Sequence, residues 1–312
     1  MPAGLSPAPL QIARATGAPF TPRYQLDYEP GHLISSAEVE GGHFLSVQGQ
    51  PSQDELVARA FSHAAEYAQL YSGCNPTSDF FNERLQRVLE SLASVRAGRV
   101  LDVGCGPGAL FPHLAKHGQF ALFGVDRSLE MIRQARALPV GITVDLAVGR
   151  LEQLPYLDQS FDVILALGVL EYLPDQRAGL MEMARLARPN AIIVVSMLNK
   201  ASLYRWWERF IYTPWSSLRS LLRGRGKQPR PALWLHTQKS LMRMMEACQL
   251  EPIDMVYYDL NVCVPPFDSK YWSWASALNR WLKPHCARRL FRLAHTAFLI
   301  KARRNTTSKL VL

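Results

Sequence analysis

The sequence predicts an α/β fold: a doubly wound, mostly parallel sheet of seven strands with a helical, Trp-rich lid formed by C-terminal inserts. Two observations carry this prediction. Short apolar runs alternate with helical stretches through the middle of the chain, and a Gly-rich turn follows the first run. Strand, helix and strand repeated in this way produce parallel strands that helices cover on both faces.

Seven runs are rich in Val, Ile and Leu and too short for helices. They span residues 99–103, 121–125, 142–148, 161–167, 191–197, 253–259 and 295–302. Between most of them, apolar residues recur at helical spacing. These helical stretches span residues 110–116, 128–137, 176–187 and 237–248.

The N-terminal part of the chain is predicted to precede the sheet as two segments. Residues 1–52 are expected to form a flexible arm, because five prolines precede residue 23, with a candidate β-hairpin around Gly41-Gly42. Residues 53–95 are expected to form a helical cap, broken at Asn75-Pro76. The remaining residues, 96–312, are assigned to one domain.

The basic charge of the chain is concentrated in its last third. Residues 200–312 contain 20 Lys and Arg against 6 Asp and Glu, and all seven tryptophans. Two inserts, at about 201–235 and 261–294, interrupt the C-terminal strands and combine Trp with Arg at helical spacing. Such amphipathic helices are typical of a lid over a cleft or of contact with an anionic membrane surface, and both interpretations stay open.

Composition excludes several classes of protein. With 48% hydrophobic and 20% charged residues, the chain is neither disordered nor fibrous. Five scattered cysteines without a C-x-x-C pair argue against a disulfide framework and a zinc site. No segment has the apolar length of a secretory signal or a membrane span. We therefore expect a cytoplasmic protein, with peripheral membrane association as an open alternative.

The segment Asp102–Gly108, DVGCGPG, is the strongest motif. Its glycines allow the backbone to approach a ligand at the N-terminus of the following helix. With Ala109 it also satisfies the dinucleotide pattern G-x-G-x-x-A, but the acid before the first glycine, Asp102, would repel a pyrophosphate. Asp126 lies 22 residues after Gly104, where a carboxylate accepts ribose hydroxyls; capping of the next helix is the alternative.

These motifs closely resemble the class I S-adenosylmethionine-dependent methyltransferases, in particular the branch with quinone-biosynthesis and natural-product methylases. Besides DVGCGPG, the resemblance includes GVDRSLEMI at 124–132 and LEQLPYLDQSFDVILALGVLEYL at 151–173. It covers about residues 99–197. It implies a Rossmann-like fold and S-adenosyl-L-methionine as the cofactor, and it says little about the acceptor.

The resemblance also implies which residues contact the cofactor. The Gly-rich turn and Asp102 would hold its methionine part, Asp126 its ribose, and Arg127 and Leu151 its adenine. Two tyrosines of the N-terminal helices would close over it, and the end of the fourth strand would face the methyl group. The full set is Asp102, Gly104, Cys105, Gly106, Asp126, Arg127, Leu151, Ala166, Leu167, Tyr67 and Tyr71.

Two positions depart from the family pattern. Relatives often have an aspartate in place of Arg150 as a hydrogen-bond partner of adenine, and Glu152 is the candidate substitute here. Some relatives carry E-x-x-E-H after the fourth strand and bind a divalent cation. This chain has GVLEY at 168–172, so we predict no metal.

Transfer to a hydroxyl requires a proton acceptor, whereas an amine or an activated carbon does not always need one. The candidates are His236, before the helix at 237–248, and Tyr172 and Glu171, after the fourth strand. A lone histidine is more often structural than catalytic, which weakens the case for His236.

The predicted activity is methyl transfer to a small lipophilic acceptor, at a hydroxyl oxygen. The aromatic inserts favour a lipophilic acceptor, and the preference for oxygen comes from the family alone. Two alternatives stay open: an RNA or protein methyltransferase that uses the basic third of the chain, and a non-catalytic cofactor-binding or regulatory protein. Nucleic acid is the less favoured partner, because the sequence contains no RNA-recognition module.

Overall fold

The computed structural model describes residues 51–62, 64–71, 76–137, 141–222, 230–283 and 292–305. The predicted N-terminal arm lies outside these residues except for its last two, and the predicted hairpin around Gly41-Gly42 lies outside them altogether. Residues 223–229 and 284–291, which belong to the two inserts, are also outside the described part.

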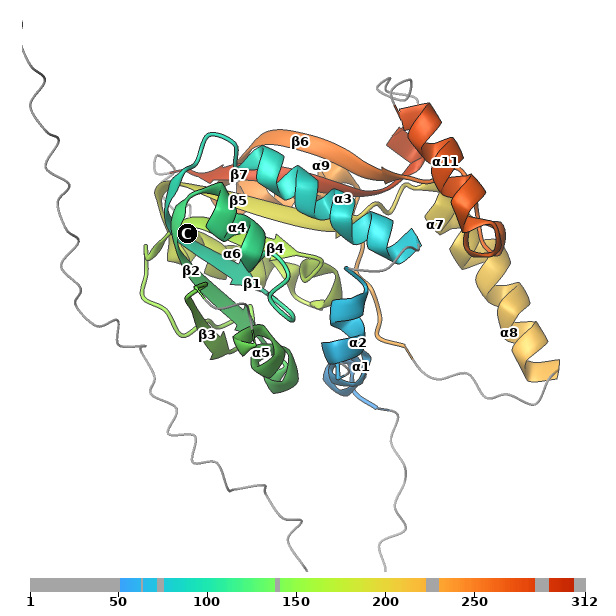
Figure 1. Cartoon of the computed structure of the whole chain (residues 1–312), viewed down its shortest axis with the longest axis horizontal. Helices are drawn as coiled ribbons and strands as arrows, with labels where there is room; N and C mark the ends of the chain where they lie inside the picture. The colour runs from blue at the N-terminus through green and yellow to red at the C-terminus, as the bar shows by residue number, and fades with distance from the viewer. Residues whose placement is uncertain are drawn as a thin grey trace, which may run out of the picture.

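A seven-stranded sheet forms the centre of the protein (Figure 1). The strands are β1 (Ala97–Val103), β2 (Gln119–Asp126), β3 (Val144–Val148), β4 (Phe161–Leu167), β5 (Ala187–Leu198), β6 (Leu250–Leu260) and β7 (His295–Arg304). Their order is β3-β2-β1-β4-β5-β7-β6, and β7 runs antiparallel to both of its neighbours while the other pairs are parallel. The predicted seven-stranded, mostly parallel sheet is confirmed.

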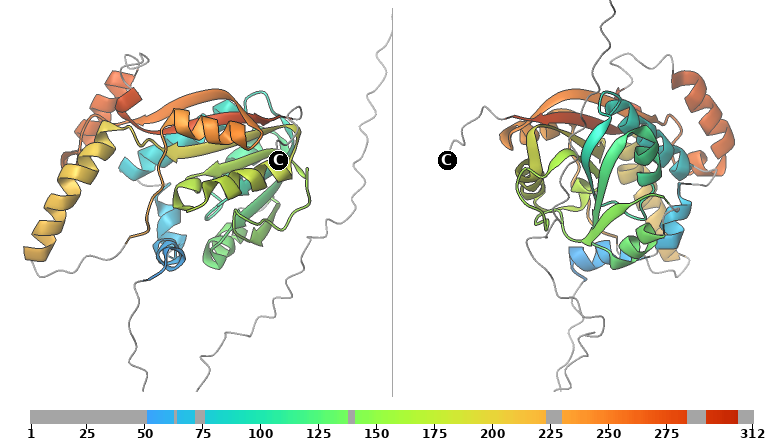
Figure 2. Two further views of the ribbon diagram at one scale, coloured as in Figure 1. Left: turned by 180° about the vertical axis from the view of Figure 1, so that it is seen from behind. Right: turned by 60° about the vertical axis from the view of Figure 1, so that its left-hand side comes forward.

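Helices cover both faces of this sheet (Figure 2). One face packs against α3 (Pro76–Ser91), α4 (Phe111–His117) and α5 (Leu129–Arg136), and the other against α6 (Gln176–Leu186) and α9 (Gln238–Ala247). Neighbouring residues of a strand therefore pack on opposite faces of the sheet. Val100 belongs to the core on the α3 side, and Leu101 to the core on the α6 side. This alternation follows from the two-residue period of a strand.

The order of the strands reverses between β1 and β4, and ligands of open α/β sheets bind at such a point, beyond the carboxyl ends of the strands. Three short helices lie at this edge: α1 (Gln53–Ala60), α2 (Ala64–Gln69) and the 3-10 helix η1 (Leu170–Tyr172). The side chain of Gln53 in α1 donates to the carbonyl oxygens of Tyr172 and Ala232, which ties the N-terminal helices to this edge.

Two helical segments extend beside the sheet rather than across it (Figures 1 and 2). The first, here called the helical arm, consists of α7 (Leu203–Trp207), the π-helical η2 (Glu208–Tyr212) and α8 (Thr213–Leu222). The second consists of α10 (Phe267–Lys270) and α11 (Trp272–Leu282). The outer part of the arm points away from the body, so the expected lid stays a prediction. Every helix in the described part of the chain is too short or too polar to cross a bilayer.

Candidate active site

The Gly-rich turn after β1 has a backbone that favours glycine. Gly104, Gly106 and Gly108 have φ angles of 70°, 54° and 81°. The amides of Gly104 and Cys105 both donate to the carbonyl oxygen of Val125, at 2.7 and 3.0 Å, which fixes the turn against β2. A Cβ at Gly104 would lie 2.3 Å from Val169 Cγ2, so a side chain there would displace the segment after β4.

Asp126, at the end of β2, supports the turn and keeps acceptor capacity. Its Oδ2 accepts from the amide of Gly106 at 2.9 Å, and its Oδ1 accepts from the amide of Ser128 at 2.8 Å. Each carboxylate oxygen has a further acceptor site for a ligand hydroxyl. Ser128, whose Oγ accepts from the amide of Met131, is the N-cap of α5. The alternative that Asp126 itself caps this helix is therefore not supported.

A cavity of about 110 Å³, here called the turn cavity, opens beside this turn. Eight of the predicted site residues line it: Tyr67, Gly104, Gly106, Asp126, Arg127, Leu151, Leu167 and Tyr172. A smaller adjoining cavity of about 30 Å³ adds three more: Asp102, Cys105 and Tyr71. Ala166 lines neither, because its side chain is fully buried in the sheet core. The structure thus brings all the predicted cofactor residues except Ala166 to one place.

An ion-pair network that the sequence did not reveal closes one side of the turn cavity. Asp54 in α1 accepts from Arg150 at 2.8 Å and from Arg127 at 3.4 Å. The hydrogen bond from Arg150 is the main cause that lowers the pKa of Asp54. Arg150 also pairs with Glu152 at 3.3 Å. Arg150, which departs from the family pattern, therefore joins the N-terminal helix to the loop after β3.

Arg84 in α3 is a second residue that the sequence reasoning missed. Its side chain is buried, donates to the carbonyl oxygen of Leu167 at 3.3 Å and to Tyr71 Oη at 3.2 Å, and lies 4.6 Å from the ring centroid of Phe81. The signal was present, because Arg84 follows Phe81 by three residues and precedes Val88 by four, which places it on the apolar side of the helix.

Asp102 lies next to this cation and is 3% exposed. Its pKa is raised to about 7, mainly by burial; the positive charge of Arg84 lowers it and the charge of Asp126 adds to the rise. An acid at the turn is thus held in a low-dielectric environment with one compensating cation.

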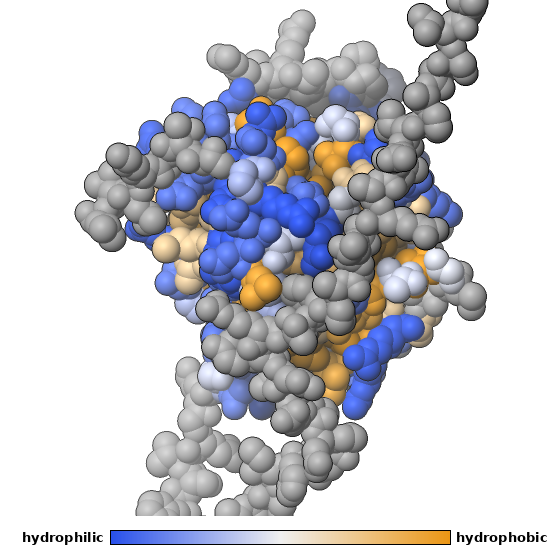
Figure 3. Space-filling model, turned by 90° about the vertical axis from the view of Figure 1, so that its left-hand side faces the viewer, coloured by the Kyte–Doolittle hydropathy of each residue, from blue (hydrophilic) through white to orange (hydrophobic). Residues whose placement is uncertain are grey.

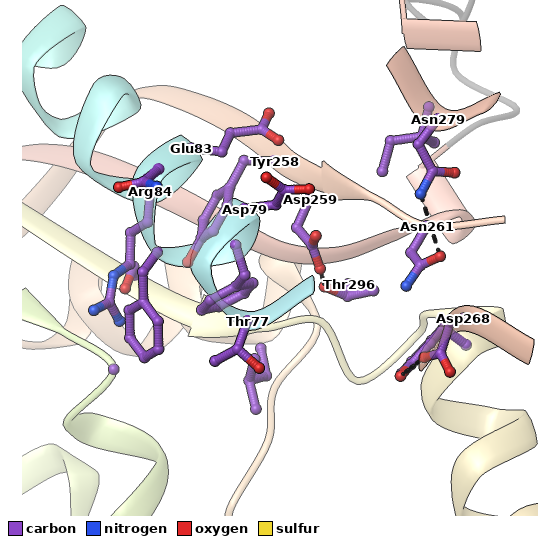
Figure 4. Close-up of a pocket in the computed structure, with 18 of the residues that line it drawn as sticks. Thr77, Asp79, Glu83, Arg84, Tyr258, Asp259, Asn261, Asp268, Asn279 and Thr296 are labelled. Carbon is purple, nitrogen blue, oxygen red and sulfur yellow. Dashed lines mark hydrogen bonds between the residues drawn. The ribbon is translucent and has the colours of Figure 1, made fainter. Parts of the chain in front are cut away.

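A larger cavity of about 520 Å³ adjoins the turn cavity and is here called the large cavity (Figure 4). Phe61, Tyr67, Gly168 and Tyr172 line both cavities, so they form the boundary between them. The other walls come from α3, the ends of β6 and β7, α7, α10 and α11. None of the described tryptophan side chains lines either cavity, and Tyr204 is the aromatic residue that the described part of the inserts contributes to the large cavity.

Glu171 faces the large cavity from η1, next to this boundary. Its side chain is 4% exposed, and its Oε2 has no hydrogen-bond partner. Burial raises its pKa to about 7, and burial likewise raises the pKa of Tyr172 to about 12. Glu171 therefore exchanges a proton near neutral pH, whereas Tyr172 stays protonated.

His236 is not brought to this site. It lines neither cavity, and its Nδ1 lies 2.8 Å from Ser240 Oγ one helical turn further along. Burial lowers its pKa, and Lys200 lowers it further. Of the three predicted proton acceptors, the geometry thus favours Glu171 over Tyr172 and leaves His236 in a local structural role.

Comparison with known proteins agrees with this geometry. The family described as "Methyltransferase domain" matches residues 101–195, from β1 into β5 and through the Gly-rich turn, Asp126 and η1. Residues 101–195 therefore form a domain of the class I S-adenosylmethionine-dependent methyltransferases. The predicted family, its Rossmann-like fold and its cofactor, S-adenosyl-L-methionine, are confirmed at this level.

Curated relatives of this chain are named as O-methyltransferases. The ubiquinone biosynthesis O-methyltransferase of Alkalilimnicola ehrlichii is 31% identical over 150 residues, which are 47% of this chain and 60% of the relative. The malonyl-[acyl-carrier protein] O-methyltransferase of Erwinia billingiae is 32% identical over 161 residues, or 50% of this chain and 58% of the relative. The matches therefore span about three fifths of these relatives.

Solved structures share the fold of this methyltransferase. Magnesium protoporphyrin IX methyltransferase from Synechocystis PCC 6803 superimposes with a TM-score of 0.53 at 16% identity, over 80% of this chain and 98% of that one. The [4+2]-cyclase SpnF superimposes with a TM-score of 0.55 at 18% identity, over 82% and 97%. Since a cyclase has the same fold, the fold alone does not establish methyl transfer.

Glu171 makes the stability of this methyltransferase depend on pH. Its carboxyl has a raised pKa in the folded state, so its contribution to stability is complete below the unfolded pKa of 4.5 and is lost as pH rises through about 7. We expect Glu171→Gln to match the wild type at pH 5 and to exceed it at pH 8 by up to about 3 kcal/mol in urea unfolding. The matched control is Glu251→Gln, at an exposed position of β6. Its free energy of unfolding should differ from that of the wild type by the same amount at pH 5 and at pH 8. Equal differences for Glu171→Gln at both pH values would contradict the assignment.

Proposed function

We propose that this protein binds S-adenosylmethionine in the turn cavity and transfers its methyl group to a hydroxyl oxygen of a small molecule held in the large cavity. The observation that carries the proposal is the shared boundary. Phe61, Tyr67, Gly168 and Tyr172 face both cavities, so a donor on one side and an acceptor on the other would meet there. Catalysis of group transfer depends above all on such an alignment.

The residues of the turn cavity fit the cofactor in polarity. Asp126 retains acceptor sites for two ribose hydroxyls. The buried side chains of Leu151, Met131 and Leu173 provide apolar surface for a flat base. Asp102 and the backbone of the Gly-rich turn lie at the other end, where an ammonium group of the cofactor would find a carboxylate. Tyr67 covers this end, since a Cβ built at Gly106 would lie 3.7 Å from its ring.

The chemical work left to the protein is orientation and proton removal. S-adenosylmethionine, when bound, supplies a methyl group on a sulfonium that is already activated toward in-line displacement. Glu171 accepts the proton of the acceptor hydroxyl, which its pKa of about 7 permits near neutral pH. Arg84 holds the end of β4 through the carbonyl oxygen of Leu167 and so positions the boundary between the cavities.

Asp126 provides the sharpest test of the cofactor site. We expect Asp126→Ala to weaken S-adenosylmethionine binding by about 10- to 100-fold, because hydrogen bonds to a charged acceptor contribute about 1.5–3 kcal/mol. Glu130→Ala, an exposed carboxylate in the next helix, is the matched control and should bind as the wild type does. Calorimetric titration measures both, and thermal melting checks that each variant folds. Unchanged affinity in Asp126→Ala would remove the site assignment.

The lining of the large cavity restricts the kind of acceptor that it could hold. The large cavity contains five acidic and four basic side chains in its lining, so it does not support an acceptor that is apolar throughout. An acceptor with a polar end in the cavity and an apolar remainder outside it remains compatible with the lipophilic molecule predicted from the sequence. The relatives named as O-methyltransferases favour oxygen as the methylated atom.

Transfer of tritiated methyl groups into fractionated cell extracts tests the acceptor class. We expect label in the small-molecule and lipid fractions, because the large cavity is enclosed by helices on several sides. Label confined to RNA or protein would overturn this proposal in favour of the RNA or protein methyltransferase. Binding of S-adenosylmethionine without labelling of any fraction would favour the non-catalytic alternative. Glu171→Gln is the reference for background transfer.

The helical arm supports a peripheral contact with an anionic membrane surface as a second part of the proposal. Its apolar side chains are exposed to an extent that is unusual in a monomer, with Trp206 at 55%, Trp215 at 50% and Leu222 at 78%. Arg209 and Arg219 lie among them, and the one acid of the arm, Glu208, is paired with Arg205 at 2.8 Å. By contrast, hydrophilic side chains cover the centre of the face in Figure 3. Arg and Trp on one exposed helix are typical of an interfacial helix.

Vesicle flotation tests this contact. We expect the protein to float with phosphatidylcholine vesicles that contain phosphatidylglycerol, and less with phosphatidylcholine alone, because the arm is basic. The double change Trp215→Ser with Leu218→Ser should lower the bound fraction at least about tenfold, since each exposed side chain loses about 1.5–3 kcal/mol of apolar transfer. Met181→Ser, an equally exposed apolar residue in α6, is the control. Absence of binding to either vesicle would leave the arm without this role.

A further inference from the structure

Most acidic side chains of the large cavity have no role in the proposed methyl transfer. Five acids line the cavity, Asp79, Glu83, Glu171, Asp259 and Asp268, and only Glu171 is assigned to the transfer. Glu83 is neutralised by Lys283, whose Nζ lies 2.7 Å from its Oε1. Tyr204 Oη donates to Asp268 at 2.5 Å. The remaining pair, Asp79 and Asp259, is here called the acidic end of the cavity.

Each acid of the acidic end accepts a hydrogen bond from a hydroxyl group; Asp79 is exposed and Asp259 is partly buried. Ser276 Oγ donates to Asp79 at 2.9 Å, and Thr296 Oγ1 donates to Asp259. Burial raises the pKa of Asp259 to about 6. The donation from Thr296 and the positive charge of Arg205 lower it, and the charges of Glu83 and Asp79 raise it. In Figure 4, Asp79 from α3 and Asp259 from β6 lie close together, with Thr296 beside them. These acids repel each other, and the positive charge of Arg205 offsets the effect on Asp259 only in part.

The basic groups of the cavity are engaged or placed elsewhere. Arg84 is bound to Tyr71 and the end of β4 on the side of the turn cavity. Arg205 pairs with Glu208, and Lys283 pairs with Glu83. Arg280 is exposed. The negative charge at the acidic end is therefore compensated only in part by the protein.

A second observation at the other end of the same cavity points to a bound molecule. Glu171 is 4% exposed, and its Oε2 has no hydrogen-bond partner, although a buried acceptor without a donor costs about 1–3 kcal/mol. Such a group is satisfied when a ligand donor fills the cavity. The cavity thus has an unpartnered acceptor near the methyl-transfer boundary and an acidic end beyond it.

We propose that the acidic end, Asp79 and Asp259, binds a protonated amine of the acceptor, so that the acceptor is a hydroxylated amine whose hydroxyl faces Glu171. This inference rests on the proposed function for the hydroxyl end. An organic ammonium fits better than a metal ion, because the described residues contain no group of three or more His, Cys, Asp or Glu placed to hold one. The aromatic wall supports the choice, since Phe80, Tyr204 and Tyr258 also line the cavity and aromatic rings attract cations.

Three phenols of similar shape and different charge test the proposal by binding alone. They are tyramine, which carries an ammonium group, 4-propylphenol, which is neutral, and 3-(4-hydroxyphenyl)propanoate, which carries a carboxylate. Calorimetric titration in the presence of S-adenosylhomocysteine keeps the donor site filled. We expect tyramine to bind at least about tenfold more tightly than either of the others. We also expect its affinity to fall between pH 7 and pH 5 as Asp259 takes up a proton.

The variants separate the acidic end from the overall charge. Asp259→Asn and Asp79→Asn should each remove most of the preference for tyramine, because the amide keeps the shape and the hydrogen bonds to hydroxyl groups but not the charge. Asp254→Asn, five residues earlier on β6 and exposed, is the matched control and should keep the preference. Equal affinity for the three phenols, a preference for the carboxylate, absence of tyramine binding, or a preference unchanged in both variants would each overturn the proposal.

The outcome is distinguishable from that of the proposed function. The phenol titrations require no methyl transfer, whereas the proposed function depends on S-adenosylmethionine binding and on transfer of label. Preferential tyramine binding without methyl transfer would leave the amine site standing and remove the proposed function. Methyl transfer without any preference for amines would support the proposed function and remove the amine site.

Discussion

One buried cation, Arg84, connects the parts of this protein that form the two cavities. Its guanidinium joins α3 to the end of β4 through the carbonyl oxygen of Leu167 and to the N-terminal helical region through Tyr71. Asp102 and Glu171, whose pKa values burial raises, both lie within its electric field. A buried charge is tolerated only with partners that compensate its desolvation. The N-terminal helical region, the Gly-rich turn and Glu171 are therefore coupled, because each contributes a partner to the same cation.

The sequence predicted the sheet and most of the turn cavity because both depend on local chemistry. Apolar runs of strand length must be buried. Glycine adopts positive φ angles most readily, so a group of glycines after a strand predicts a tight turn. Asp126 was found for the same reason, since the end of β2 lies next to the turn in any sheet of this order. The prediction of Ala166 failed because neighbouring strand residues point to opposite faces. Ala166 faces the core, and Leu167 faces the cavity.

What the sequence could not predict are the contacts between distant segments. Asp54 meets Arg150 across 96 residues, and Asp79 meets Ser276 across 197. Neither pair carries a periodic signal, because the direction in which α1 and α11 approach the sheet decides the contact. His236 was a candidate because it precedes the helix at 237–248. Its side chain instead contacts Ser240, one helical turn further along. Sequence separation alone does not show where a side chain points.

The division of charge in the last third of the chain follows the same geometry. This third contains 20 basic and 6 acidic residues, yet two of the six acids, Asp259 and Asp268, line the large cavity. Basic side chains such as Arg209 and Arg219 lie on the exposed arm, where water solvates them and their apolar neighbours remain uncovered. The inserts therefore do two separate things: their inner residues, such as Tyr204 and Asp268, line a polar cavity, and their outer residues expose cations and tryptophan away from it. Residues 101–195, which match the methyltransferase family, contribute few of these groups, and the choice of acceptor accordingly depends on the segments that lie outside that match.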